Sequence, residues 1–334
     1  MAATPKRLTA GGNMRILVQS LVLALSTLGT FAHAQDFPTK PITIVNPLTA
    51  GTGVDVMTRL YADAVARDTG QRILVENKTG SGGIAAALAV KDARPDGYTL
   101  LVAHVGTQST LPAMQTLPFD ALKDFEPITE LFYFPTYLVV PAASPAKTAA
   151  DLIALAKTKP GGLRLASQGV GSGTHILGAI WQDLAKAPIE HVPYRGSGQI
   201  LPDLLAGRVD MSFISYLTIR ELVKDGKLRI LAIASPTRWS GLPDVPTMAE
   251  AGYPGVDQDT WFGVAAPAGT PKAVVAKLFD LFVKASTDPA LVKRASDDGV
   301  TIATSKSPQA FGELWTSEAA RWGKIVRALN IKAE

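Results

Sequence analysis

The stretch that decides the fold runs from Ile42 to Arg59 and reads ITIVNPLTAGTGVDVMTR. It opens with a short apolar run, Ile42 to Val45, of the kind found in strands that are buried on both faces. From Val54 onward apolar residues recur every three to four positions, which indicates a helix with one buried face that ends at Gly70. The stretch therefore predicts a strand, a small-residue turn over 49–53 and a helix.

The turn over 49–53 is a candidate anion site because it feeds a helix N-terminus. The first N–H groups of a helix have no partner within the helix, and the helix dipole places roughly half a positive charge there, so a carboxylate or phosphate is stabilised without a cationic side chain. Glycines let an anion approach the backbone. An ordinary turn, in which the glycines only satisfy backbone geometry, explains this single loop equally well.

The same pattern of strand, glycine-rich turn and helix recurs along the chain. Three further turns have it, at 80–83, 169–174 and 196–198. Alternating strands and helices with short connections are typical of parallel sheets covered by helices. Because ligands of open α/β sheets bind at the carboxyl ends of the strands, four such turns indicate anion-recognising loops on two facing domains.

The spacing of apolar residues in the rest of the chain predicts the other strands and helices. Further strands are expected at 72–76, 98–103, 163–167, 189–192, 211–215, 228–235 and 261–266. Further helices are expected at 84–91, 151–157, 176–184, 199–205, before Gly226, and at 271–286 and 308–329. The apolar segment Phe125–Val140 is longer than one ordinary strand and contains Pro135, so it is expected to pass between domains. We predict one domain from 35–136 and 236–334, with the first anion-binding loop and the C-terminal helices, and a second from 137–235, with the second anion-binding loop.

The N-terminus has the features of a secretory signal peptide. Basic residues precede an apolar run over 16–28 that is too short to span a bilayer, and Ala32-His33-Ala34 provides small residues at a cleavage site after Ala34. A retained anchor and a start at Met14 are the alternatives. The prediction is a periplasmic protein with a signal peptide over 1–34.

Composition of the mature chain excludes several classes of function. Removing three of the 33 basic residues leaves 30 against 29 acidic residues, and no basic cluster is interleaved with aromatics, so nucleic acid is not an expected partner. There is no cysteine, which excludes thiol nucleophiles and sulfur metal sites. The three histidines that remain after processing have no metal-binding spacing. We expect no cofactor and no metal.

Enzyme motifs fail on inspection. The loop at 169–174 has Thr174 where a dinucleotide fingerprint needs its third glycine, and no acidic residue follows at the required distance. A hydrolase elbow around Ser172 would need glycine at positions that hold Val170 and Thr174. His175 follows Ser172 closely, but adjacency in one turn is not a catalytic triad.

The candidate binding residues are therefore backbone and hydroxyl donors of the loops. Arg195 is a charged donor for a second carboxylate, with a solvated or structural role as the alternative. His175 is interpreted as a loop support, and Trp261 as a pocket wall or a core residue. The full set is Thr49, Ala50, Gly51, Thr52, Gly53, Thr107, Gln168, Gly171, Ser172, Gly173, Thr174, His175, Arg195, Ser215 and Trp261.

The mature chain also resembles the solute-binding receptors of tripartite tricarboxylate transporters, the Bug-type periplasmic proteins. The matching segments cover nearly all of it. They are FPTKPI at 37–42, the loop at 51–55, VENKTG at 75–80, PDGYTLL at 95–101, GSGTH at 171–175, VPYRG at 192–196, PDVPT at 243–247 with EAG at 250–252, and WFG at 261–263 leading to APAGTP at 266–271.

The resemblance implies a two-lobed periplasmic-binding-protein-like fold (type II), with two doubly wound, mainly parallel sheets joined by crossing strands. It implies a monomeric receptor that closes on a small mono- or dicarboxylate, aliphatic or aromatic, and delivers it to a membrane permease. An exported enzyme and a receptor for a sensor kinase are the alternatives. The sequence departs from the commoner family pattern at several positions, which leaves the ligand open: Asn46, Leu48, Thr52, Val54, Ser215 and Tyr216.

Overall fold

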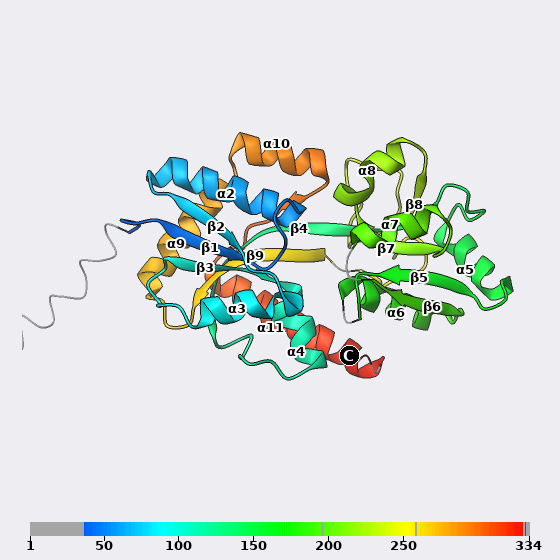
Figure 1. Cartoon of the computed structure of the whole chain (residues 1–334), viewed down its shortest axis with the longest axis horizontal. Coiled ribbons are helices and arrows are strands. Elements are labelled where there is room, and N and C mark those ends of the chain that lie inside the picture. Colours follow the sequence, from blue (N-terminus) through cyan, green and yellow to red (C-terminus); the bar gives the residue numbers. More distant parts are fainter. Residues whose placement is uncertain (1–36, 171, 195–196, 258, 330, 332–334) are drawn as a thin grey trace, which may run out of the picture. The chain divides into compact units, whose positions relative to one another are not determined.

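The computed structural model describes residues 37–170, 172–194, 197–257, 259–329 and 331 (Figure 1). The predicted signal peptide and its cleavage site at Ala34 lie outside the described residues, as do Gly171 and Arg195. Among the described residues, no helix is both long enough and apolar enough to cross a membrane.

The first sheet is built on three parallel strands, β1 (Ile42–Asn46), β2 (Ile73–Asn77) and β3 (Thr99–His104). β1 lies in the middle, with Val45 opposite Glu76 on one side and Leu101 on the other. β9 (Asp259–Pro267) runs antiparallel between β3 and β4, and the short β10 (Thr301–Ile302) also pairs with β4. The strands β1 and β3 carry short apolar runs because helices cover both of their faces, whereas the outer strand β2 alternates half-buried and exposed residues.

The second sheet repeats this plan. β5 (Leu163–Ser167) lies between the parallel strands β6 (Ile189–Pro193) and β7 (Met211–Ser215). β4 runs antiparallel to β7 and to β8 (Leu228–Ala234). Each sheet therefore combines three parallel strands with antiparallel ones.

The strand β4 (Phe125–Pro141) belongs to both sheets, as the long apolar segment predicted. Its residues 125–135 pair with β9 in the first sheet, and 136–141 pair with β8 in the second. Pro135, which has no N–H to donate, is the last residue of β4 paired with β9. The α/β class with two sheets and a crossing strand is confirmed, and the exact domain boundaries stay predictions.

Helices flank both sheets (Figure 1). Around the first sheet, α2 and α10 lie on one side and α3 and α11 on the other. The helices are α2 (Gly53–Thr69), α3 (Ile84–Lys91), α4 (Leu111–Met114), α5 (Ala149–Thr158), α6 (Gly173–Ala185), α7 (Ser197–Leu205), α8 (Tyr216–Lys224), α9 (Lys272–Ala285), α10 (Pro289–Asp298) and α11 (Pro308–Ala328), with a 3-10 turn at Ser81–Gly83 and a π-helical turn at Gly106–Thr110.

Apolar clusters of described residues hold these layers together. One joins Val45 and Leu101 of the first sheet to Phe311 and Trp315 of α11. Two others cover opposite faces of the second sheet, under α5 and α6 and under α7 and α8. A buried apolar face on each helix is what the three-to-four spacing of apolar residues predicts.

Four elements were not expected from the sequence: α10, β10, α4 and the π-helical turn at 106–110. For α10 the local signals were present, because Asp288 caps the helix before Pro289 and Gly299 ends it with φ +67°. π-Helical turns have no comparable sequence signature, and they are frequent at functional sites.

Candidate functional site

The predicted loops follow the carboxyl ends of parallel strands in both sheets. The loop at 49–53 follows β1 and Thr107 follows β3, whereas 168–175 follows β5 and Ser215 ends β7. Open α/β sheets bind their ligands at this edge, because loops and helix N-termini meet there. The topology therefore places nearly all the described candidates where a ligand is expected.

The loop at 49–53 is held by its own hydrogen bonds. Thr52 caps α2 by accepting from the N–H of Asp55, and its hydroxyl donates to the carbonyl of Thr49 at 2.8 Å. Gly51 has φ +82°, a left-handed conformation that other residues adopt at a cost. Gly51 is therefore required by the backbone itself, whatever the loop binds.

A buried carboxylate organises this loop from behind. Asp55 accepts from the N–H of Gly51 at 2.9 Å, from Asn77 Nδ2 at 2.8 Å and from Arg59 Nε at 3.0 Å. Burial alone would raise the pKa of Asp55, but the hydrogen bonds from Arg59, Gly51 and Asn77 outweigh it and hold the pKa below its ordinary value. The N–H of Gly51 is thus occupied by the protein's own carboxylate.

The next two backbone donors are the N–H groups with which α2 begins. Among the described residues, the N–H groups of Gly53 and Val54, the first two of α2, have no hydrogen-bond acceptor. Leu217 of α8 lies against Gly53, so that a Cβ added there would come within 2.2 Å of Leu217 Cδ2 and 3.2 Å of Phe134. The start of α2 therefore contacts the start of α8, which follows the second sheet.

The loop at 168–175 is built in a similar way. Ser172 caps α6 by accepting from the N–H of His175, and its hydroxyl donates to the carbonyl of Gly169 at 2.7 Å. The hydroxyl of Thr174 accepts from the N–H of Gln168 at 3.0 Å. Both hydroxyls thus position the loop, and they lie 3.1 Å from each other.

His175 supports this loop by stacking. Its ring lies parallel to that of His191 with 3.9 Å between the centroids, and Ser167 contacts His191 Nε2. Burial, and then the neighbouring His191, lower the pKa of His175 to about 4, and burial lowers the pKa of His191 as well. Two neutral rings stack without the repulsion that two imidazolium ions would suffer.

The Ser172 cap can be tested by substitution. Ser172→Ala is expected to lower the free energy of unfolding by about 1 kcal/mol, as for other lost helix caps. If the loop binds a carboxylate, affinity should also fall by a factor that corresponds to roughly 1 to 3 kcal/mol. Thr148→Ala is the matched control, because Thr148 caps α5 in the same way. Titration calorimetry should show weaker binding in Ser172→Ala only, and equal affinities would remove the Ser172 hydroxyl from the site.

The other candidates occupy different surroundings. Thr107 is buried in the π-helical turn and donates to Gln108 and to the carbonyl of His104. The hydroxyl of Ser215 lies 3.0 Å from that of Thr218 at the start of α8. Trp261 is 3% exposed and packs against Phe311 and Trp315, which corresponds to the core role weighed for it.

Three residues that support the loop at 49–53 were not among the site residues predicted from the sequence. Asp55 and Arg59 have readable signals, since Thr52 and Asp55 have the spacing of a capping pair and Arg59 lies four residues further on the same helix face. Asn77 has none, because it reaches Asp55 and the carbonyl of Leu48 only through the pairing of β2 with β1.

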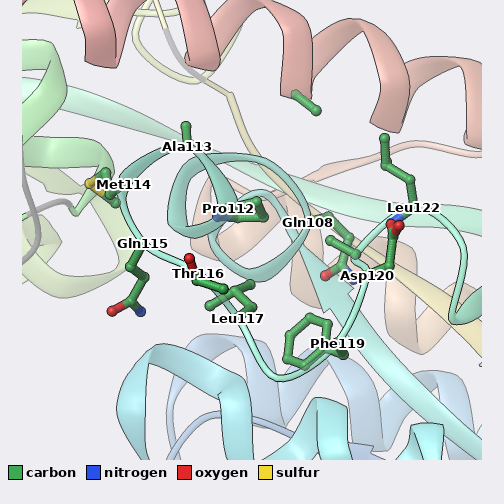
Figure 2. A pocket seen from close by; sticks show the side chains of 12 residues that line it. Gln108, Pro112, Ala113, Met114, Gln115, Thr116, Leu117, Phe119, Asp120 and Leu122 are labelled. Atoms are coloured by element: carbon green, nitrogen blue, oxygen red, sulfur yellow. The ribbon is translucent and has the colours of Figure 1, made fainter.

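An open pocket of about 810 Å³ lies elsewhere, between the segment 108–122 and Ala319 of α11 (Figure 2). Its walls include apolar side chains such as Met114, Leu117 and Phe119. None of the residues of the 49–53 or 168–175 loops lines it, so it is separate from the candidate anion loops. The described part of the chain also holds no group of three His, Asp or Glu side chains that could bind a metal ion.

Comparison with known proteins identifies the family. The chain belongs to the receptors of the tripartite tricarboxylate transporter family, whose model matches residues 57–331. This finding confirms the family resemblance that the segments from 37 to 271 indicated.

Relatives and solved structures agree with this assignment. Protein BugT of Bordetella pertussis is 32% identical over 96% of this chain and 99% of its own length. The R. palustris protein Rpa4515, solved with adipate, is 31% identical with a TM-score of 0.80 over 89% of this chain and 99% of its own. MatC of Rhodopseudomonas palustris, solved with malate, is 32% identical with a TM-score of 0.76 over 87% of this chain and 100% of its own.

Proposed function

We propose that this protein is a periplasmic receptor that captures a small carboxylate between its two sheets and delivers it to the membrane permease of a tripartite transporter. The observation that carries the proposal is the pair of capped helix starts, α2 and α6, at the carboxyl edges of the two sheets. At the first of them, two backbone N–H groups have no acceptor among the described residues. Such donors stabilise a carboxylate without a cationic side chain.

The family supports the same chemistry. Two proteins that share this fold, Rpa4515 and MatC, were solved with the dicarboxylates adipate and malate, respectively. The signal-peptide pattern over 1–34 supports export to the periplasm. The proposed role involves no catalysis, because the loops hold their hydroxyls in helix caps, and no base activates them as nucleophiles among the described contacts.

Closure of the two lobes follows from the positions of the donors. A carboxylate held at the start of α2 gains the second set of donors, at the start of α6, only when the two sheets approach each other. A ligand shifts such an equilibrium by its differential affinity for the two states. A permease would then recognise the loaded receptor by its shape.

Binding is tested by thermal shift. A panel of aliphatic and aromatic mono- and dicarboxylates should contain at least one that raises the melting temperature. A ligand that binds only the folded protein stabilises it by roughly 2.7 kcal/mol when the ligand concentration is about a hundred times the dissociation constant. The amide or ester of the same compound should do much less. Stabilisation by sugars or cations, with none by any carboxylate, would refute the proposal.

A further inference from the structure

Two side chains at the carboxyl ends of strands in the first sheet have buried donor atoms without a partner. Asn46 ends β1 with none of its surface exposed; its Oδ1 accepts from the N–H of Leu48 at 3.1 Å, and its Nδ2 has no partner. His104 ends β3; its Nδ1 accepts from the N–H of Gly106 at 3.0 Å, and its buried Nε2 has no partner. In both residues the acceptor atom has a hydrogen bond and the donor atom has none.

These hydrogen bonds fix the polarity of both groups. A backbone N–H only donates, so the atom facing Leu48 must be the oxygen of Asn46, and its NH₂ group is the unpaired end. By the same argument Nδ1 of His104 carries the lone pair and Nε2 carries the proton. Burial lowers the pKa of His104 to about 4, so the ring remains a neutral donor at neutral pH.

Asn46 and His104 lie on the same face of the sheet. Val45 of β1 is opposite Leu101 of β3 in a parallel pair, so Asn46 is level with Val102, and His104 lies two residues further along. Side chains alternate along a strand, which places Asn46 and His104 on one face. A Cβ at Gly83 would be 2.9 Å from His104 Nε2 and 3.2 Å from Cβ of Pro47, the residue after Asn46. The two donors thus share one end of the first sheet.

The π-helical turn at 106–110 also contains buried polar atoms without a hydrogen-bond partner. Gln108 and Ser109 of the π-helical turn are buried, and Gln108 Nε2 and Ser109 Oγ have no partner. A buried donor without an acceptor is costly, and each such group in a native protein calls for an explanation, of which a bound molecule is one. Thr107 of the same turn would lie 2.8 Å from a Cβ at Gly83, as His104 Nε2 would at 2.9 Å, so the turn adjoins this end of the first sheet.

We propose that Asn46 Nδ2 and His104 Nε2 bind an acceptor-only oxygen group of the ligand, a second carboxylate or a keto oxygen, at the carboxyl ends of β1 and β3. This inference rests on the proposed carboxylate receptor and narrows its ligand. An ammonium group only donates hydrogen bonds, so it would face two further donors at this position. The receptor therefore selects dicarboxylates or keto acids over amino acids of the same length.

The wild-type protein tests this selectivity directly. Titration calorimetry compares succinate with 4-aminobutyrate and adipate with 6-aminohexanoate, pairs with the same number of carbon atoms in which a terminal CH₂–NH₃⁺ group replaces one carboxylate. At least 100-fold tighter binding of the dicarboxylate is expected in the pair that binds. Equal affinities within a pair would overturn the inference and leave the carboxylate receptor standing, whereas binding of no carboxylate at all would overturn both.

Substitution of the donors tests the residues. Asn46→Asp keeps the oxygen that accepts from Leu48 and turns the donor into an acceptor, so dicarboxylate affinity should fall at least 30-fold at pH 8. The loss should shrink toward pH 5.5, because a protonated carboxyl group donates again. His104→Phe keeps the ring beside Phe262, whose centroid is 5.8 Å away, and should lose about tenfold in affinity.

The control places the same amide-to-acid change on the surface. Gln309→Glu, at the exposed start of α11, should bind like the wild type. Folding of each variant is checked by circular dichroism and by its melting temperature without ligand. If folded Asn46→Asp and His104→Phe both bind the dicarboxylate within twofold of the wild type, these residues do not contact the ligand.

Discussion

Acidification from pH 7 to pH 4 is expected to lower the free energy of unfolding by several kcal/mol. His104, His175 and His191 all have lowered pKa values in the folded protein, chiefly because they are buried. For His104 the pKa falls from 6.5 to about 4, and each unit corresponds to about 1.4 kcal/mol, so this residue alone contributes roughly 3 kcal/mol.

The sign follows from proton uptake. Between pH 6.5 and 4 the unfolded chain binds protons at histidines that the folded protein keeps neutral, so stability rises with pH in this window. The contribution is complete above pH 6.5 and is lost as the pH falls toward 4. Carboxylates with hydrogen-bond partners, such as Asp55, have a lowered pKa, so the stability that they contribute is lost at a more acidic pH than that of the histidines.

Urea denaturation at pH 7.5, 6, 5 and 4, in a buffer free of carboxylates, measures this dependence. The variant His104→Phe should show a shallower slope between pH 6.5 and 4, because it removes one of the three groups. A wild-type free energy that stays constant from pH 7 to pH 5 would contradict the buried neutral state of these histidines.

The sequence predicted most of the fold because its signals are local. The apolar runs of β1, β5 and β7 and the turns after β1 and β5 agree with the structure within a residue or two. The length of 125–140 predicted a strand shared by two sheets, and β4 is such a strand. The turn at 106–110 could not be found in this way, since a π-helical turn depends on its surroundings more than on its own residues.

The site was only partly predictable for a related reason. Helix caps at Thr52 and Ser172 follow from residue type and position, and the structure shows both. The contacts of Asn46, Asn77 and His104 depend on which strands become neighbours, which a single sequence does not specify. For Trp261 the sequence predicted the strand but not the role of the side chain. The structure shows that this side chain packs against Phe311 and Trp315.

Removal of the Asp55 carboxylate should damage both stability and binding. The side chain of Asp55 is 4% exposed and joins Gly51 of the loop, Asn77 of β2 and Arg59 of α2. Asp55→Ala leaves the Gly51 N–H and the Asn77 amide without their acceptor. Breaking a buried ion pair costs about 3 to 5 kcal/mol, and we expect about 2 to 4 here because Arg59 is 46% exposed and regains water.

The matched control is Asp151→Ala in α5. Asp151 also accepts from backbone N–H groups before a helix and forms a capping box with Thr148, but it is exposed and has no link to another strand. Its loss should cost about 1 kcal/mol or less and leave ligand affinity unchanged. Chemical denaturation gives the two stabilities, and calorimetry with the stabilising carboxylate gives the affinities.

The stability and the ligand affinity of Asp55→Ala together show whether the loop at 49–53 needs the Asp55 carboxylate in order to bind its ligand. Without the carboxylate, Gly51 at φ +82° loses the hydrogen bond that orients its peptide, so the start of α2 should no longer present the N–H groups of Gly53 and Val54 in one fixed direction. Affinity should then fall at least tenfold at a temperature where the variant is still folded. If Asp55→Ala loses stability as expected but binds the carboxylate as tightly as the wild type, the start of α2 is not where the anion is held.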